Sequence, residues 1–418
     1  MADVVENLNV LAKEVFGEKG VPDLVPDMTK LQKEIPFSKG EQLGLKFAQT
    51  VRLAYPNGFT HQKGDGTAGA FAFQNAKPGA QGRAEMLGFQ TLLRDQMSYE
   101  DAAKLTGSKQ AFAKGTEFFF KGLQMSMRKR LEVEFFHGGQ GIGAILGTPS
   151  TIHTSNKLIT MSTAQWCPGV WAGNEGMEID AYNGSTLINT NAPLTVVSSD
   201  PVARTVEVSG NATDLGNLAT TYTLYYRGAY GLEMTGVHGI LNNSGVLFNI
   251  DASVYSLWKS TQYAPTSGAL TFAKVKKAIA IAVSKGLDED CVLYCHPSTW
   301  DDINSDIAAL RRTSDKDVKK VDIGSEEIYY HSQNGVTKIV PTIYAKEGFA
   351  YGLCNPKENW MRVGASDVTM NTPGFEGDLF LHLPSAAGVE ARAYTHQAIL
   401  CLAPAKQFII SNIVNTSY

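Results

Sequence analysis

The spacing of hydrophobic positions changes several times along the chain and divides it into segments. Residues 43–53 alternate in part between apolar and polar side chains, which predicts a strand, and the segment FQTLLRDQM at 89–97 predicts another. Between them lies a stretch rich in glycine and proline, from Tyr55 to Gly88. We therefore expect two strands around a long glycine-rich tip, and an excursion of this length is normally functional.

Two helices are predicted before residue 140. Apolar residues at helical spacing predict a short amphipathic helix over 3–16. The segment 18–40 is interrupted by prolines, and we interpret it as an extended arm that finds its burial elsewhere. Farther along, the pattern from Phe112 to Leu131 predicts a helix over 108–136. That helix would be more than twice the usual length of about 11–12 residues.

The segment HGGQGIGAILG at 137–147 contains the spacing G-x-G-x-x-A, which can cradle a pyrophosphate. A dinucleotide-binding turn follows a strand and opens a helix, whereas this one follows a predicted helix. We interpret Gly138 as the left-handed residue that ends the helix, and the rest as a tight turn. A nucleotide-binding enzyme remains an alternative that requires a strand before Gly138 and a helix after Gly143.

The second half of the chain changes from strands to an alternating pattern. Residues 155–230 are rich in Thr, Ser, Asn, Gly and Val and predict a small antiparallel β insertion. From residue 269, helical and strand patterns alternate, with CVLYC at 291–295 as a buried strand and Asn334-Gly335 as a hairpin turn. The chain ends in alternating strands. The fold class is therefore α+β.

Composition excludes several classes of protein. The chain has 418 residues, 43% of them hydrophobic, and a net charge of −4, so it can bury a large core but lacks the basic excess of a sequence-reading nucleic-acid binder. No signal peptide and no run of about 18 apolar residues is present. The five cysteines are scattered and contain no C-x-x-C pair, which predicts neither a disulfide framework nor a zinc site. We therefore expect the chain to fold in a reducing cytoplasm.

Catalytic patterns are weak. His396 lies near Glu390 and Arg392, but alternation along a strand explains that spacing. We interpret Asp288, Glu289 and Asp290 as a solvated turn rather than a metal site, and the aromatic pair Trp166 and Trp171 as core rather than a stacking platform. We therefore predict no catalytic, cofactor-binding or metal-binding residues, no cofactor and no enzymatic activity.

The order of the segments resembles that of the major capsid proteins of tailed bacteriophages, whose fold is shared with encapsulins and herpesvirus capsid floor domains. The resemblance spans nearly the whole chain. The local marks that carry it are MSYEDAAKLTGSKQAF, RKRLEVEFFHGGQGIGAILG, GLEMTGVHGILNNSG, CVLYCHPSTWDDIN, HSQNGVTKIVPTIYAKEGFAYGL and the tail GVEARAYTHQAILCLAPAKQFIISNI. None of these is a catalytic motif, and their order carries the resemblance.

The resemblance implies a domain layout. It comprises an N-terminal arm (1–40), an extended loop lying over a neighbouring subunit (41–97), a peripheral domain (98–154 and 231–268) with a spine helix (108–136), a β-rich insertion domain (155–230), an axial domain (269–369), and C-terminal strands returning to the peripheral domain (370–418). Apolar side chains on the loop, such as Phe71 and Phe73, would become contact area on a neighbour.

The resemblance also implies a function. The chain would self-assemble through pentamers and hexamers into the icosahedral head of a tailed bacteriophage, enclosing double-stranded DNA. Partners would be further copies, scaffolding, portal and decoration proteins, and packaged DNA through non-specific contacts, with no membrane. It would assemble in the host bacterial cytoplasm and reside in the virion capsid. Because the chain begins at Met1, we expect no removed pro-region and a separate scaffolding protein.

Two alternatives keep a structural role: an encapsulin-like nanocompartment shell, and a phage surface or tail protein. Some members of the resembled family cross-link lysine to asparagine. Lys63 and Lys77 lie on the loop, but the sequence identifies no partner for them, and we expect no cross-link here.

Overall fold

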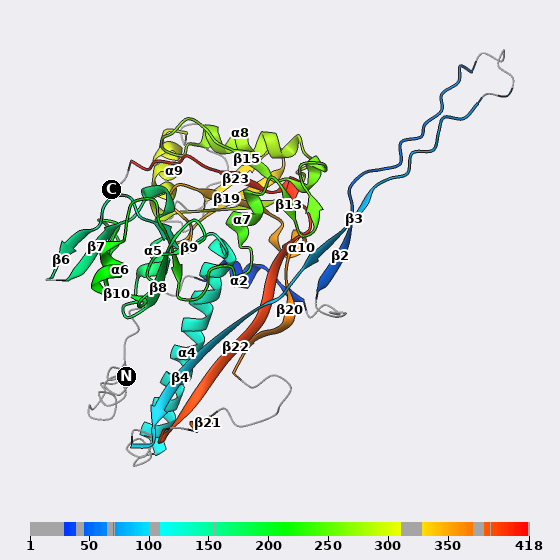
Figure 1. Cartoon of the computed structure of the whole chain (residues 1–418). Coiled ribbons are helices and arrows are strands. Elements are labelled where there is room, and N and C mark those ends of the chain that lie inside the picture. The colour runs from blue at the N-terminus through cyan, green and yellow to red at the C-terminus, as the bar shows by residue number, and fades with distance from the viewer. Residues whose placement is uncertain are drawn as a thin grey trace.

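The computed structural model describes residues 29–38, 46–64, 70, 72–100, 109–153, 155–310, 328–370, 380–384 and 386–416. The helix expected over 3–16 lies outside these residues. Three sheets of five or more strands and one long helix form most of the described part, and a narrow hairpin projects far from them (Figure 1). None of the described helices is long and apolar enough to cross a membrane.

The long helix is α4 (Lys109–His137), which confirms the helix predicted over 108–136. Beside it runs an antiparallel pair formed by β4 (Phe89–Ser98) and β22 (Gly388–Cys401), in continuous register from Phe89 opposite Gln397 to Ser98 opposite Gly388. The sheet is completed by β1 (Phe37–Ser38), β20 (Trp360–Thr369) and β21 (Leu381–His382). The described apolar face of α4 packs on the core through residues such as Leu123, Met127 and Leu131.

The projecting hairpin begins with β2 (Phe47–Arg52) and β3 (Gln81–Met86), paired antiparallel. Past these strands the two arms run on as extended chain, joined by bonds such as the one from Asn57 N to Lys77 O at 3.0 Å. Figure 1 shows these arms leaving the body of the molecule. The two predicted strands are present as β2 and β4, but they do not flank one hairpin: β2 pairs with β3, which the prediction had placed inside the glycine-rich tip, whereas β4 pairs with β22.

A second sheet has eight strands in the order β5-β12-β8-β10-β11-β7-β6, with β9 paired to β8. Its strands are β5 (Gly143–Ala144), β6 (Ser150–Ile152), β7 (Asn156–Thr160), β8 (Glu178–Asn183), β9 (Thr186–Leu187), β10 (Leu194–Asp200), β11 (Thr205–Ser209) and β12 (Thr223–Tyr226), joined by the short helices η1 (Thr163–Gln165), α5 (Pro168–Trp171) and α6 (Ala212–Gly216). Trp166 and Trp171 stack inside it, both buried, which confirms them as core.

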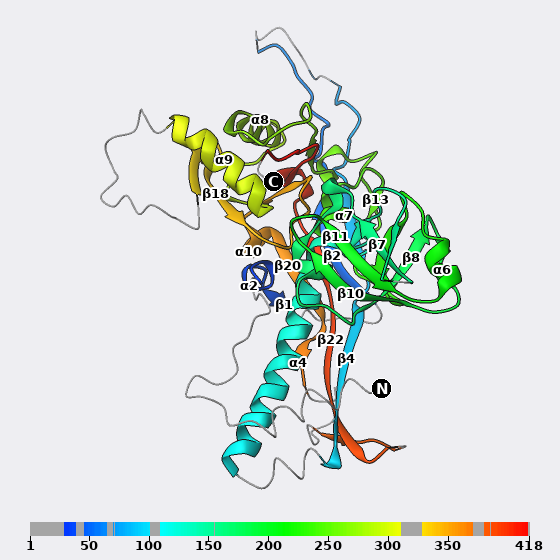
Figure 2. The ribbon, with the colours of Figure 1, turned by 90° about the vertical axis from the view of Figure 1, so that its left-hand side faces the viewer.

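A third, mixed sheet has six strands in the order β15-β23-β19-β16-β18-β17. They are β15 (Thr261–Tyr263), β23 (Phe408–Ile410), β19 (Ala350–Cys354), β16 (Cys291–Cys295), β18 (Gly335–Pro341) and β17 (Ile328–Ser332), and α8 (Phe272–Val283) and α9 (Pro297–Leu310) belong to the same unit. This sheet has a hydrophobic core of its own. The second sheet and α9 lie on opposite sides of the upper end of α4 (Figure 2).

Short elements connect these units. They are α2 (Leu31–Glu34), α7 (Val237–Leu241), β13 (Val246–Leu247), β14 (Ile250–Asp251), η2 (Ser256–Trp258), α10 (Pro356–Asn359) and η4 (Pro404–Lys406).

The glycine turn after α4 differs from the expectation in one respect. The left-handed residues are Gly139 (φ +74°) and Gly141 (φ +73°), not Gly138. Gly138 is required for a different reason: a Cβ there would overlap the backbone oxygens of Met234 and Glu134. Since a helix precedes the turn and β5 follows it, both elements that the nucleotide-binding alternative required are missing, and that alternative is wrong.

The prediction that the cysteines form no disulfide is also wrong. Cys291 and Cys354 are bonded. They are 63 residues apart in the sequence, but the antiparallel register of β16 and β19 places them directly opposite each other. Sequence spacing could not show this, because it depends on which strands become neighbours. The other three cysteines are buried free thiols.

We expect Gly138→Ala to destabilise the chain, because the new methyl group has no room beside Met234 and Glu134. The free energy of unfolding should fall by about 1–3 kcal/mol, the usual effect of overpacking. Urea unfolding followed by tryptophan fluorescence measures it. Gly147→Ala is the matched control, since a Cβ there meets nothing within 4 Å. Equal effects at the two positions would contradict the close-packing role of Gly138.

Candidate functional site

The residues considered for catalysis do not form a catalytic cluster. Glu390 is buried on β22 and pairs with Arg94 and Arg392, while the Nδ1 atom of His396 accepts a hydrogen bond from the backbone N–H of Ala365 at 3.0 Å. Among the described residues, no three His, Cys, Asp or Glu side chains gather as a metal site would need. The candidates for a functional site among the described residues are therefore contact surfaces and buried polar junctions.

The hairpin is the most exposed apolar feature of the described chain. Tyr55, Phe59 and Phe73 are 76%, 71% and 85% exposed. Its described residues carry five basic side chains against the single acid Glu85; the basic ones are Lys46, Arg52, Lys63, Lys77 and Arg83. Exposed aromatic rings on an extended, positively charged arm mark an interaction surface rather than a part of the subunit core.

The base of the hairpin is fixed to the body. Ala84 and Met86 are buried, and the backbone N–H of Glu85 donates to the carbonyl of Phe248 at 2.9 Å. A Cβ at Gly82 would collide with Leu53 and Ile250. The direction in which the hairpin leaves is therefore set by close packing at β3 and β14.

A groove of about 760 Å³ lies between β4, α4 and the second sheet. One wall is β4, which is hydrogen-bonded only to β22 among the described strands, so its other edge is open. On the floor, the Arg130 guanidinium lies over the Tyr226 ring and bonds Glu134 and Glu233 at 2.8 and 2.9 Å.

The groove carries a small excess of acidic side chains. Its lining includes four glutamates, Glu134, Glu175, Glu178 and Glu233, against Lys129, Arg130 and Arg227. Burial, together with the nearby Glu134 charge, raises the pKa of Glu233 to about 7, although Arg130 opposes the rise. Where Glu233 is ionised, the four carboxylates outnumber the three cations, so a basic extended segment would complement the groove.

A buried carboxylate anchors the segment before the hairpin. The Glu132 side chain on α4 accepts hydrogen bonds from the backbone N–H groups of Lys30, Leu31 and Gln32 at 2.9, 2.7 and 3.0 Å, at the start of α2. The Glu34 carboxylate then accepts from the Tyr294 hydroxyl on β16. Full burial raises the pKa of Glu132 to about 7 against the effect of the three backbone donors. One short helix is thereby tied to both α4 and the third sheet.

A second polar junction lies where α4 ends. The Lys346 ammonium is buried and donates to the carbonyl of Gly141 at 3.2 Å and to Gln165 Oε1 at 2.6 Å. His137 Nε2 bonds the Tyr344 carbonyl at 2.6 Å. His238 Nδ1 bonds the Tyr351 hydroxyl at 3.0 Å. These contacts join the glycine turn to the third sheet and to the second.

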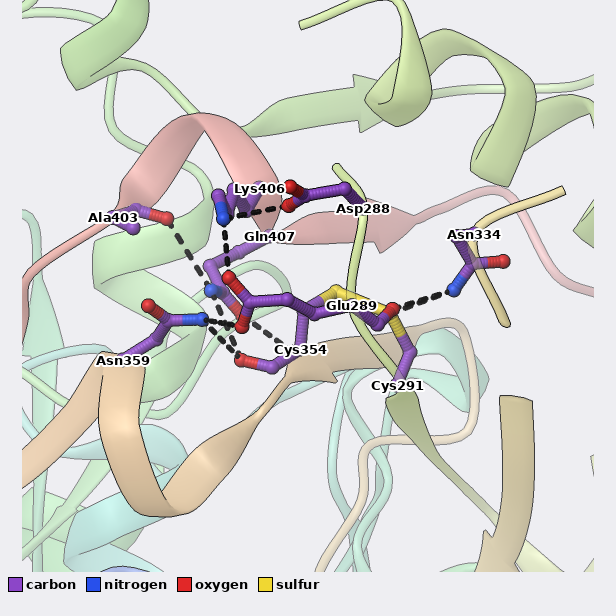
Figure 3. Close-up of polar contacts among 9 residues, drawn as sticks. All are labelled: Asp288, Glu289, Cys291, Asn334, Cys354, Asn359, Ala403, Lys406 and Gln407. Atoms are coloured by element: carbon purple, nitrogen blue, oxygen red, sulfur yellow. Dashed lines mark hydrogen bonds and ion pairs between the residues drawn. A yellow bond between two sulfur atoms is a disulfide. The ribbon is translucent and has the colours of Figure 1, made fainter. Parts of the chain in front are cut away.

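A third junction lies where the chain leaves the third sheet and returns to it (Figure 3). The Gln407 side chain is fully buried; its Oε1 accepts from Cys354 N at 2.7 Å and from Trp360 Nε1 at 3.0 Å. Asn359 donates to Glu289 at 2.8 Å and to the Cys354 carbonyl at 3.1 Å. The outgoing segment 354–360 and the returning segment 401–408 are thus held together beside the disulfide.

The acidic turn at 288–290 belongs to this junction. The Lys406 ammonium pairs with Asp288 at 2.7 Å and with Glu289. Asp290 accepts from the backbone N–H of Val336 at 2.8 Å. All three acids of the turn therefore pair with protein groups, although Asp288 is exposed. The interpretation of the turn as solvated missed these partners.

Sequence reasoning also missed Glu132, Glu233, Lys346 and Gln407. The one signal available for such residues is a charge inside an apolar run, as in LEVEFF at 131–136, where Glu132 and Glu134 interrupt core positions. Their partners lie on distant segments, which local patterns do not reveal.

A scan against protein-family models and a search of curated proteins each find no match. Among solved structures, the chain is similar to the capsid of cyanophage A-1(L), with 10% identity over 97% of this chain and 99% of that one, and a TM-score of 0.51. It is also similar to the capsid of an empty GTA particle, with 8% identity over 96% and 95% of the two chains and a TM-score of 0.48.

A third similar structure is the holo-SrpI encapsulin complex from Synechococcus elongatus, with 9% identity over 96% of this chain and 94% of that one, and a TM-score of 0.42. Only the first of these three scores exceeds 0.5, and the fold assignment rests on it. The chain has the α+β fold of tailed-phage major capsid proteins, which confirms the fold expected from the resemblance.

We expect His238 to make stability depend on pH. Burial lowers its pKa to about 3, with the Lys346 charge as a second cause, whereas an unfolded histidine takes up a proton below about pH 6.5. Lowering the pH from 6.5 toward 3 therefore favours the unfolded chain by about 1.4 kcal/mol per pH unit. The stability advantage of the wild type over His238→Gln should shrink by that slope in urea titrations at pH 6 and 5.

Leu241→Ala is the matched control, because Leu241 is buried on the same helix and does not titrate. Its destabilisation should be the same at both pH values. If the two variants show the same pH dependence, His238 does not carry the effect.

Proposed function

We propose that this chain is a major capsid protein that assembles through pentamers and hexamers into the icosahedral head of a tailed bacteriophage, enclosing double-stranded DNA. The observation that carries the proposal is the hairpin: its aromatic rings stay exposed in a single subunit although its base is rigidly packed. The full-length likeness to a cyanophage capsid supports it. The role is structural rather than enzymatic.

The three sheets suggest how the domains divide. We assign α4 and the sheet around β22 to the peripheral domain and the six-stranded sheet to the axial domain. The eight-stranded sheet is the insertion domain, and since it includes β5 and β6, we draw its boundary before residue 155, at 143. The arm (1–40), the loop (41–97) and the C-terminal strands (370–418) keep the ranges expected from the sequence.

The acidic groove is the surface that we assign to a neighbour's hairpin. The hairpin is basic and extended, and the groove has both an acidic lining and an open strand edge on β4. A strand laid along β4 would satisfy its free backbone groups, and opposite charges would orient it. Repeating one such contact around a closed shell makes a modest pairwise affinity sufficient.

The remaining partners follow from the role. Scaffolding, portal and decoration proteins would contact the shell, packaged DNA would touch its inner surface without sequence reading, and assembly would take place in the host bacterial cytoplasm. A net charge of −4 would keep the electrostatic attraction between the shell and DNA weak. Such contacts do not depend on the DNA sequence, so any sequence could be packaged.

The first test shortens the hairpin. Replacing residues 58–76 with an Asn-Gly turn removes Phe59 and Phe73 but keeps the bond from Asn57 to Lys77 that closes the arms. We expect the purified variant to fold with an unchanged unfolding midpoint and to form no shells under electron microscopy, whereas the wild type with its scaffolding protein forms closed shells. Normal shells from the variant would contradict the role of the hairpin, and a monodisperse wild type would contradict the capsid function.

The second test reverses charge in the groove. Glu175 and Glu178 are exposed on its rim, so Glu175→Lys with Glu178→Lys should repel a basic hairpin and lower the yield of shells at least tenfold at low salt. Added salt should lessen the defect by screening. Asp301→Lys with Glu358→Lys is the control, because both residues are exposed, lie outside the groove lining, and change the net charge by the same amount. Wild-type assembly by the groove variant would place the hairpin elsewhere.

A further inference from the structure

The disulfide occupies a distinctive position in the topology. Cys354 is the last residue of β19, and Cys291, directly opposite, is the first residue of β16. At Asn355 (φ +41°) the chain turns into α10, and from Trp360 it runs in the sheet that packs beside α4. The bond therefore lies at the last point where the outgoing segment is held by the third sheet.

The returning segment is anchored at the same place. Gln407 accepts from the backbone N–H of Cys354 and donates to its carbonyl, and β23 starts one residue later. Lys406 pairs with Glu289, two residues before Cys291. Figure 3 shows Lys406 and Gln407 bonded to Glu289 and to the Cys354 carbonyl beside the disulfide. Breaking or forming the disulfide would therefore affect both segments that connect the two sheets here, 354–360 and 401–408.

The two sulfurs differ in their surroundings. Asn334, at the turn between β17 and β18, donates its side-chain N–H to Cys291 Sγ at 3.4 Å and to the Glu289 carbonyl at 2.9 Å. A donor aimed at sulfur stabilises the thiolate, which is the reactive form of cysteine. This contact favours Cys291 over Cys354 as the attacking thiolate.

The other cysteines lack such a setting. Burial raises the pKa of the Cys167 and Cys295 thiols to about 12 and that of Cys401 higher still. None of the three is bonded to a second sulfur. Exchange chemistry is thereby confined to one pair.

We propose that Cys291 and Cys354 form a reversible thiol–disulfide site that takes small-molecule disulfides of the glutathione class as oxidant, and whose closure fixes the junction between the two sheets. The proposal concerns the subunit alone and stands whether or not the shell function is correct. It gives the chain two covalent states: a dithiol in reducing surroundings and a stapled form in oxidising ones.

The chemistry balances as two exchanges. The Cys291 thiolate attacks one sulfur of the small disulfide, forming a mixed disulfide and releasing one thiol. The Cys354 thiolate then attacks the Cys291 sulfur and releases the second. The protein loses two electrons and two protons, and the reagent takes them up as two thiols. Because both cysteines are buried, the protein around them has to open before the first attack can occur.

The test uses the full chain, reduced and freed of reductant, then incubated with oxidised glutathione. Alkylation in denaturant and peptide mapping by mass spectrometry should find Cys291 joined to Cys354 and the other cysteines alkylated. The oxidised chain should unfold about 5 °C or more above the reduced one. Cys291→Ser with Cys354→Ser should abolish that difference, whereas Cys401→Ser, a buried cysteine outside the pair, should retain it.

Several outcomes overturn the proposal. Separately alkylated Cys291 and Cys354 after oxidation, both in the folded chain and in chain refolded with the oxidant, would show that no bond forms. Equal unfolding temperatures of the bonded and reduced wild type would show that the bond does not fix the junction. This comparison needs no variant, so a double serine variant that fails to fold does not weaken it.

A second measurement tests the order of attack. Asn334→Asp keeps the size of the side chain but replaces the donor with a negative charge beside Cys291, so oxidation should slow severalfold while the same pair still forms. An unchanged or faster rate would overturn the assignment of Cys291 as the attacking thiol.

Discussion

The buried C-terminal end of α4 is the constraint on which the rest of the molecule depends. Residues 131–138 are all buried, and they include two glutamates and a histidine. Glu132 holds the start of α2, Glu134 shares Arg130 with Glu233, and His137 bonds a carbonyl beside the third sheet. Burying such groups is unfavourable unless each finds a partner. The three connections supply these partners, so the buried end of α4 depends on all of them.

This arrangement makes the body of the subunit a frame, from which the hairpin projects as the longest extension of the described residues. The helix, the three sheets and the polar junctions hold each other through contacts between distant segments, while the hairpin arms are joined mainly to each other. A subunit built in this way can fold before it meets a neighbour. If the proposed shell forms, the hairpin can therefore dock on a neighbour without disturbing the frame.

Local patterns were sufficient for the elements that repeat a period over many residues. The spacing from Phe112 to Leu131 predicts α4 because a long helix places an apolar residue on its buried face at every turn. The polar contacts that join the sheets have no such signal: Cys354 and Gln407 acquire their roles only when β19 and β23 become neighbours. Gly138 shows the limit within one motif: the sequence marks the turn, but it does not show that Gly138 is required by the approach of Met234 while Gly139 and Gly141 take the positive φ values.

A chain that is 10% identical to a cyanophage capsid can share its fold because the demands of the fold are positional. The face of α4 has to be apolar, the residue after it has to be small, and each buried charge needs a partner. The hairpin tip and the groove rim meet none of these demands, since they are exposed in the subunit. If one copy's hairpin lies in the next copy's groove, both surfaces are encoded in the same chain. A change in one can then be matched by a change in the other without altering the frame.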